Sequence, residues 1–196
     1  MPYYINGDVT QYLRASVIEE RYRVTLSLVL QVTDALEYLH SSGITHKDIR
    51  GSNILVDGHG SARLTDVGLA PVLGTAGLFP SMKVVPSPRW APPELIRYAG
   101  DASGAPFTTR SDVYSLGMTI YEMLALKKPF DGIRSESHVC YIVWAGQRPA
   151  KPEGYNENLH GALWSIIQEC WKSDPTSRPT VADVRTVVQN SSLHDP

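Results

Sequence analysis

Apolar residues recur every three or four positions between about residues 19 and 41. The repeating positions are Val24, Leu28, Val32, Leu36 and Leu39. This period predicts one amphipathic helix with a single buried face. The Ser42-Gly43 pair that follows is a typical helix end. A shorter helix is predicted upstream, because Asp8 precedes Gln11 by the three residues of a capping box.

Two short apolar runs follow the long helix and predict a β-hairpin. The runs are Asn53–Asp57 and Ala62–Asp66, and the four residues between them, Gly58–Ser61, are turn formers. Gly58-His59-Gly60 superficially resembles a phosphate-binding loop, but it completes no G-x-G-x-x-G pattern because Arg63 stands in the last position. We therefore expect a hairpin turn there.

The second half of the chain reads as helical. Residues 69–90 are rich in Pro, Gly and Ser and have no period, which predicts a long loop. Helices are expected at about 111–126, 136–145, 158–172 and 180–190. The fold class expected is mainly α (α+β), a helical bundle with one small β-hairpin.

Composition excludes several classes of protein. The 196 residues suffice for one domain with a core, and 42% of them are hydrophobic. A net charge of −2 suggests no nucleic-acid or membrane partner. The first ten residues do not resemble a signal peptide, so we expect a cytoplasmic or nuclear protein. Cys140 and Cys170 are too few for a disulfide framework and are expected to be buried thiols.

The most informative spacing lies in residues 46–53, His-Lys-Asp-Ile-Arg-Gly-Ser-Asn. Asp48 precedes Asn53 by five residues, and Asp66 follows Asn53 by thirteen. One carboxylate can orient a hydroxyl nucleophile, while an amide oxygen and a second carboxylate can hold magnesium on ATP. The predicted hairpin would bring Asn53 and Asp66 to the same end. A zinc site at His46 and Asp48 lacks a third ligand at a suitable spacing.

Further motifs come in a fixed order along the chain. They are Asp66-Val67-Gly68, the segment Trp90–Glu94 that ends in Pro-Glu, the segment Ser111–Gly117, and the segment Asp174–Pro179. Together with residues 46–53 they resemble the C-terminal (large) lobe of the eukaryotic protein kinase family, of the Ser/Thr or tyrosine-kinase-like type. The likeness runs nearly from end to end of residues 1–196.

The resemblance implies a role for each cleft residue. Asp48 would orient the substrate hydroxyl, and Arg50 would stabilise charge on the transferred phosphate. Asn53 and Asp66 would bind Mg²⁺ with ATP. The interlobe hinge would correspond to residues 1–7, where Tyr3, Tyr4 and Ile5 would pass the adenine. The loop and metal-binding motif would be 44–68, the activation segment 66–94, and the helical subdomain 111–190.

Three other residues have structural roles by the same resemblance. Glu94 and Arg178 would form a buried ion pair that ties the end of the activation segment to the helical base. Asp112 would accept hydrogen bonds from the backbone of the catalytic loop. A plain helix N-cap is the alternative interpretation of Asp112.

The sequence departs from the family pattern at several points. No Lys precedes Lys47 and no Gly-rich loop precedes residue 46, so the N-terminal lobe is expected to be absent. Val67 replaces the usual Phe, Lys47 the usual Arg, and Pro92 the usual Ala. Ser87 stands where Ser/Thr kinases place Thr, which favours Ser/Thr substrates. Candidate phosphorylation sites in the loop are Thr75, Ser81 and Ser87.

Three hypotheses about function remain open at this stage. The chain belongs to a protein kinase that phosphorylates protein Ser/Thr, it is a kinase-like binding scaffold, or it is a fragment of a longer kinase gene. With one wall of the cleft, it is expected to bind ATP weakly and to be inactive or incomplete alone. Its partner would be a protein substrate or a protein ligand.

Overall fold

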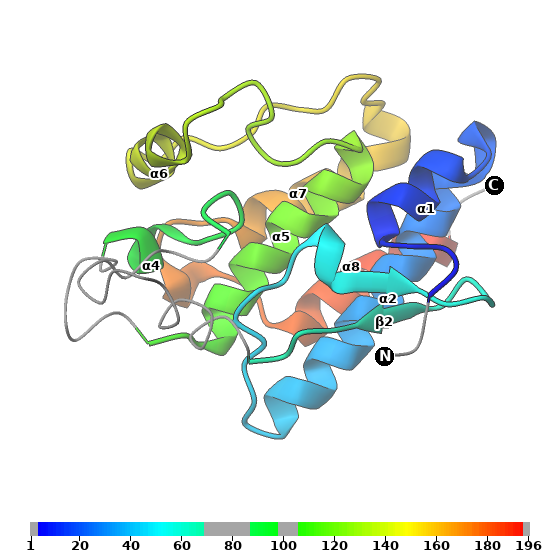
Figure 1. Cartoon of the computed structure of the whole chain (residues 1–196), viewed down its shortest axis with the longest axis horizontal. Coiled ribbons are helices and arrows are strands. Elements are labelled where there is room, and N and C mark those ends of the chain that lie inside the picture. Colours follow the sequence, from blue (N-terminus) through cyan, green and yellow to red (C-terminus); the bar gives the residue numbers. More distant parts are fainter. Residues whose placement is uncertain (1–3, 69–86, 98–105, 194–196) are drawn as a thin grey trace.

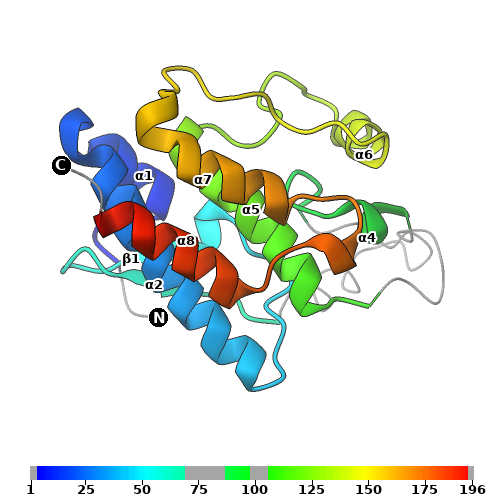
Figure 2. The ribbon, with the colours of Figure 1, turned by 180° about the vertical axis from the view of Figure 1, so that it is seen from behind.

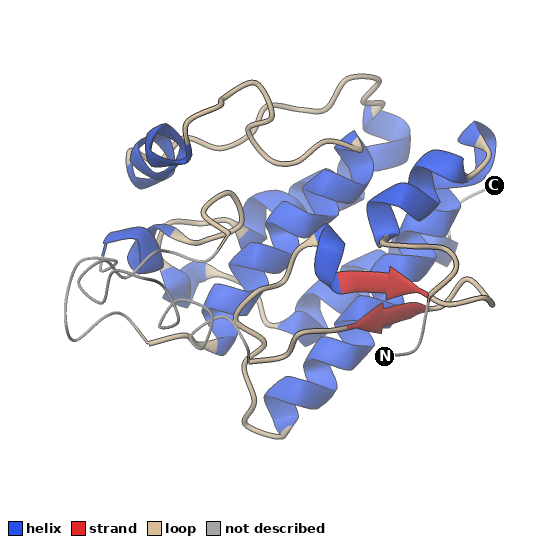
Figure 3. Ribbon diagram, viewed as in Figure 1, coloured by secondary structure: helices blue, strands red, loops and turns tan. Residues whose placement is uncertain are grey.

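A computed structural model gives the fold and describes residues 4–68, 87–97 and 106–193 (Figure 1). Predictions for Tyr3, Thr75 and Ser81, and for most of the loop 69–90, lie outside these residues. Within them the chain is mainly helical, with one two-stranded antiparallel sheet (Figure 3). The predicted fold class is confirmed.

The N-terminal helices follow the sequence pattern closely. Helix α1 spans Val9–Ala15, and Asp8 and Gln11 form the predicted capping box at its start. Helix α2 spans Arg21–Ser41 and turns its apolar stripe toward the core, with Leu28, Val32 and Leu36 buried and the two end positions partly buried. The predicted start at about residue 19 is two residues early, because Ile18–Glu20 form a separate 3₁₀ turn. Gly43 ends the helix with φ of 73°, a conformation that glycine adopts without strain.

The hairpin forms as predicted but is shorter. Strand β1 spans Ile54–Val56 and strand β2 spans Ala62–Leu64, with Ile54 opposite Leu64. The turn is held by Asp57, whose Oδ1 accepts hydrogen bonds from the amides of His59 and Ser61. These bonds make residues 58–61 a hairpin turn.

The four predicted C-terminal helices are all present, with ends shifted by up to three residues. They are α5 Thr109–Ala125, α6 Glu136–Trp144, α7 Glu157–Cys170 and α8 Val181–Leu193. Short 3₁₀ turns occur at Gly51–Asn53 and Pro175–Ser177. The short helix α4, Pro93–Arg97, was not predicted. Five residues give too few turns for a helical period to be read from sequence.

Two pairs of helices build the core. Helix α2 packs along α8, and α5 packs along α7 (Figure 2). Helices α5 and α7 approach closely at Gly117, where a Cβ atom would come within 2.6 Å of Cys170 Cβ.

Cys170 is fully buried, whereas Cys140 is only half-buried, so the expectation of two buried thiols is wrong for Cys140. None of the described helices has both the length and the apolar character that crossing a bilayer requires.

Candidate active site

Residues 46–53 run from the end of α2 to the start of the hairpin and place Asp48 beside Asn53. Asn53 Nδ2 donates to the backbone oxygen of Asp48 at 2.8 Å and to its Oδ2 at 2.9 Å. The amide group therefore uses its nitrogen to orient the Asp48 carboxylate. Its oxygen, Oδ1, accepts a long hydrogen bond of 3.4 Å from the Ser52 hydroxyl, and among the described residues it keeps acceptor capacity for a cation.

The hairpin brings Asn53 and Asp66 to the same end. Asn53 directly precedes β1, and its backbone oxygen accepts a hydrogen bond from the Thr65 amide at 2.9 Å. Asp66 comes next, exposed and with φ of 61°, a left-handed conformation that Asp tolerates better than most residues. Two oxygen ligands from neighbouring chain segments suit Mg²⁺, which needs few protein ligands when it also binds phosphate.

Arg50 links this loop to the segment 87–92. Its Nη1 donates to Ser87 Oγ at 2.8 Å. Its guanidinium also lies over the Trp90 ring, 4.8 Å from the ring centroid, at a distance typical of a cation–π contact. Two residues of the segment 87–92 therefore hold the Arg50 side chain, which extends from the loop.

His46 is fully buried, and burial lowers the pKa of its imidazole. Its Nδ1 accepts a hydrogen bond from the Asp48 amide at 3.3 Å. A neutral imidazole at neutral pH fits this acceptor role, because a protonated ring would carry a hydrogen on that nitrogen.

Helix α5 supports the loop with a ridge of buried polar residues. The ridge consists of Asp112, Ser115, Thr119 and Glu122, spaced three, four and three residues apart. Residues at this spacing lie on one face of a helix. Sequence reasoning identified only Asp112, although polar residues at helical spacing in an apolar helix were a usable signal.

Each ridge residue contacts the loop or the segment 87–92. Asp112 accepts from the amides of His46, at 2.8 Å, and Lys47, at 2.9 Å. Ser115 Oγ donates to the Trp90 oxygen, and Thr119 Oγ1 to the Ile49 oxygen.

Two details of Asp112 correct and extend the sequence interpretation. The N-cap of α5 is Thr108, so the alternative of Asp112 as a plain N-cap is wrong. Asp112 also bonds the ring of His40 at 2.8 Å and is 1% exposed. Its bond to Lys47 holds a residue with φ of 77°, a conformation that costs energy for any side chain but glycine.

Glu122 is the ridge residue that sequence reasoning missed most clearly. Its Oε2 accepts from the Gly51 amide at 2.9 Å and from Trp90 Nε1 at 3.0 Å. Burial raises the pKa of this carboxyl, while the two hydrogen bonds act in the opposite direction. A Cβ atom at residue 51 would come within 2.9 Å of the carboxyl group, so a side chain there would displace the carboxyl group that holds the loop.

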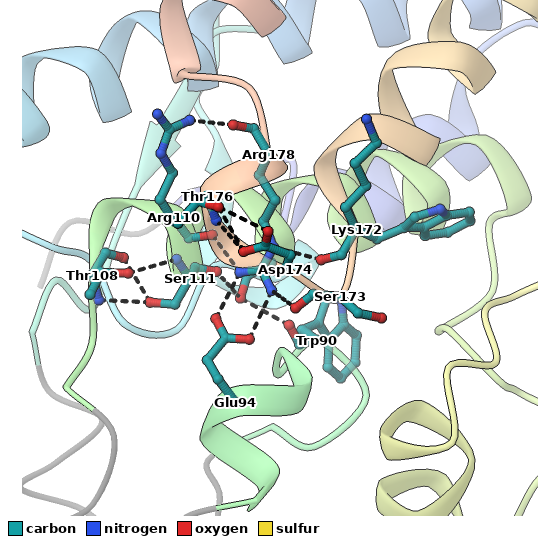
Figure 4. A network of polar contacts seen from close by, with 12 residues as sticks. Trp90, Glu94, Thr108, Arg110, Ser111, Lys172, Ser173, Asp174, Thr176 and Arg178 are labelled. Carbon is teal, nitrogen blue, oxygen red and sulfur yellow. Dashed lines mark hydrogen bonds and ion pairs between the residues drawn. The ribbon is translucent and has the colours of Figure 1, made fainter.

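Glu94 and Arg178 form the expected ion pair (Figure 4). Arg178 Nη1 and Nη2 donate to the two carboxylate oxygens at 2.7 and 2.8 Å. The Arg178 side chain is fully buried and also donates to the backbone oxygens of Lys172 and Arg110. This fork geometry is one that Arg can supply and Lys cannot.

The predicted hinge is described only from residue 4 onward. The Tyr4 oxygen accepts from the Gly7 amide, and the Gly7 oxygen accepts from Val56. The Ile5 side chain is 74% exposed. These contacts place the segment beside the hairpin.

Comparison with known proteins decides the family. Residues 1–188 match the family of protein tyrosine and serine/threonine kinases. The chain belongs to this protein kinase family. Its mainly helical fold with one hairpin is that of the family's C-terminal lobe.

Individual kinases match over nearly the whole chain. A probable serine/threonine-protein kinase of Dictyostelium discoideum is 28% identical over 93% of the chain, and a dual specificity protein kinase of the same organism is 27% identical over 95%. A serine/threonine/tyrosine-protein kinase of Arabidopsis thaliana is 26% identical over 95%. The chain spans 19%, 13% and 45% of these three relatives, which is less than half of each.

Proposed function

We propose that this chain forms the catalytic side of a protein kinase cleft that transfers the γ-phosphoryl group of ATP to Ser or Thr hydroxyls of a protein. The hydrogen bonds from Asn53 to Asp48 carry the proposal. They fix one carboxylate and leave an amide oxygen beside it, which is the pairing that phosphoryl transfer needs.

In this proposal each cleft residue has one task. Asp48 orients the substrate hydroxyl and accepts its proton. Arg50 places positive charge beside the transferring group and is held there by Ser87 and Trp90. Positioning and charge stabilisation are what this reaction requires, because its loose transition state needs little covalent assistance.

The residues present fit a magnesium–ATP complex. Asn53 Oδ1 and the Asp66 carboxylate are hard oxygen donors that the hairpin brings to one end, and we assign them to the metal. Bound ATP would supply the phosphoryl group. Tyr4 and Ile5 remain candidates for contact with the adenine by resemblance. The sequence contains neither an ATP-anchoring Lys before residue 47 nor a Gly-rich loop, so we expect this chain by itself to bind ATP weakly.

The contact between Arg50 and Ser87 supports Ser/Thr substrates. Ser87 Oγ accepts from Arg50 Nη1, so a hydroxyl residue at 87 joins the catalytic loop to the segment 87–92. A Pro at this position, as tyrosine kinases usually have, could not make that bond. We propose on this ground, together with the resemblance, that the substrate residues are Ser and Thr.

The test is phosphoryl transfer from radiolabelled ATP to a mixed protein substrate, measured with the native protein that contains this chain. Asp48→Asn is expected to lower kcat by at least about a hundredfold, the low end of a general-base contribution. The matched control is Asp34→Asn, which should retain activity. Asp34 is an exposed carboxylate on α2 that pairs with Arg185. Phosphoamino-acid analysis of the product separates Ser/Thr from Tyr transfer. Full activity in Asp48→Asn would rule out the assigned role.

A further inference from the structure

Arg89 is a buried guanidinium that directs all its described hydrogen bonds to one stretch of chain. Only 2% of the surface of Arg89 is exposed. Its Nη1 donates to the backbone oxygens of Pro129, at 2.9 Å, and Phe130, at 2.7 Å, and Nη2 donates to that of Ile133. Its Nε donates to Glu136 Oε1 at 2.8 Å. All four acceptors lie in residues 129–136, which lead from α5 into the first turn of α6.

This arrangement depends on the shape of arginine. A buried cation is tolerated when its donors are satisfied, and here three neutral carbonyls and one carboxylate accept from four of the five N–H groups. The Glu136 carboxylate is half exposed and still hydrated. The three carbonyl groups therefore offset most of the free energy that the loss of water costs the Arg89 guanidinium. A lysine at residue 89 would have one nitrogen and could not reach acceptors spread over eight residues.

The residues on both sides of Arg89 contact Arg50. Ser87 accepts the hydrogen bond from Arg50 Nη1, and the Trp90 ring lies under the Arg50 guanidinium. The backbone of this segment is short and turned, with Trp90 N donating to the Ser87 oxygen. Any shift of Arg89 therefore moves both groups that hold Arg50.

We propose that Arg89 is a positioning residue, which sets the location of Arg50 by fixing the segment 87–92 to the α5–α6 connection. The inference rests on the proposed kinase function, in which Arg50 acts on the transferring group. Arg89 itself does not touch the cleft. The placement of Arg50 consequently depends on residues 129–136, which are far from it in the sequence.

Hydrogen exchange of the amides tests the anchoring without any need for activity. Arg89→Lys should speed exchange at Trp90 and Ala91, whose amides donate to Ser87 and Pro88, by at least about tenfold, the effect of losing one charged hydrogen bond. Arg148→Lys is the matched control. Its guanidinium also donates to backbone oxygens, those of Trp171, Val143 and Gln147, but away from the segment 87–92.

A second variant keeps the test decisive if Arg89→Lys does not fold. Glu136→Gln removes only the half-exposed charge that Arg89 Nε contacts, and it should speed exchange at the same amides to a smaller extent. Unchanged exchange at Trp90 and Ala91 in Glu136→Gln would by itself overturn the proposal. Exchange in a folded Arg89→Lys that is unchanged, or raised no more than in Arg148→Lys, would overturn it as well.

Kinetics of the native protein provide the second measurement. Arg89→Lys should lower kcat by about tenfold or more and leave the KM for ATP within about twofold, because the nucleotide ligands Asn53 and Asp66 are not attached to this segment. Arg148→Lys should keep kcat near that of the wild type. Equal kcat values in the two variants would show that Arg89 is merely structural. A wild-type protein without phosphoryl transfer would refute the proposed function, and the exchange result would still decide the anchoring.

Discussion

Glu122, in the fourth turn of α5, accepts a hydrogen bond from the backbone amide of Gly51 at 2.9 Å. The two residues are 71 positions apart in the sequence. The bond fixes the middle of residues 46–53 to helix α5. The same carboxylate oxygen holds the Trp90 ring, so one buried charge aligns the loop and the segment 87–92.

The contribution of Glu122 to the free energy of unfolding should depend on pH. Burial raises its pKa in the folded protein, so its contribution to stability is fully present below the unfolded value near 4.5 and is lost as pH rises through the folded pKa. Glu122→Gln keeps an acceptor oxygen and cannot ionise. Its stability relative to wild type should therefore improve as pH rises from about 4 to 7, measured by urea unfolding.

Two controls sharpen this prediction. Glu153→Gln changes a carboxylate on the surface and should show a flat difference across the same pH range. Glu122→Ala should lose roughly 1–3 kcal/mol at every pH for each buried donor left without a partner. A difference for Glu122→Gln that does not change with pH would mean that the group does not titrate in this range.

Tyr114 is expected to tolerate loss of its hydroxyl. The residue is fully buried, and among the described residues no hydrogen-bond partner lies within reach of its oxygen. Two guanidinium groups lie over its ring, those of Arg178 at 5.0 Å and Arg148 at 5.3 Å from the centroid. Tyr114→Phe should keep stability or raise it by up to about 1 kcal/mol, because a buried unpaired hydroxyl is removed.

The ring itself should matter far more than the hydroxyl. Tyr114→Ala should cost about 3–5 kcal/mol, the range for truncating a buried aromatic side chain. Thermal and urea unfolding of the two variants give the comparison. A loss above about 1 kcal/mol for Tyr114→Phe would indicate that the hydroxyl has a partner in solution.

Breaking the Glu94–Arg178 pair should destabilise the protein asymmetrically. Glu94 is 21% exposed and its side chain can be rehydrated, whereas the Arg178 side chain is fully buried. Glu94→Gln leaves a buried cation without its counter-charge and should cost about 3 kcal/mol or somewhat less. Arg178→Lys should cost at least as much, because one ammonium cannot replace the bonds to Glu94, Lys172 and Arg110.

A double-mutant cycle measures the coupling of this pair. The variants Glu94→Gln, Arg178→Lys and their combination should show an interaction energy of at least about 1 kcal/mol that changes little with salt. The exposed pair Lys127–Glu153 serves as the control, and its coupling should be near zero. Equal coupling in the two pairs would contradict the burial argument.

His160 should make stability depend on pH below about 6.5. Burial lowers the pKa of its ring, and its Nδ1 accepts from the Asn156 amide at 3.0 Å. The folded pKa lies below the unfolded value of about 6.5, so this contribution is present above pH 6.5 and is lost as pH falls through the folded pKa. His160→Gln should flatten this part of the profile, measured as melting temperature against pH.

A matched control for this experiment is His138→Gln, at an exposed ring on α6. This variant should keep the wild-type profile. The buried His46 has a lowered pKa for the same reason, so part of the pH dependence should persist in His160→Gln. If melting temperature against pH is the same in His160→Gln and in wild type, the pH dependence of stability comes from other groups.

The sequence by itself determined the local elements and the identity of the family. The helical period of residues 24–39, the capping box at Asp8 and the spacing of Asp48, Asn53 and Asp66 are local patterns, and each follows from chain geometry. The short helix α4 and the 3₁₀ turn at Ile18–Glu20 were missed, because neither is long enough to show a period.

Only the tertiary structure decided how the cleft is supported. The bonds from α5 to residues 46–51 join positions 65 to 71 residues apart, and Arg89 joins residue 89 to residues 129–136. No local propensity encodes such pairs, since they arise when apolar packing of α5 against α7 and α2 brings a buried polar ridge under the loop. The sequence therefore predicts the residues of the cleft, and the packing of the helices determines which buried polar groups hold them in place.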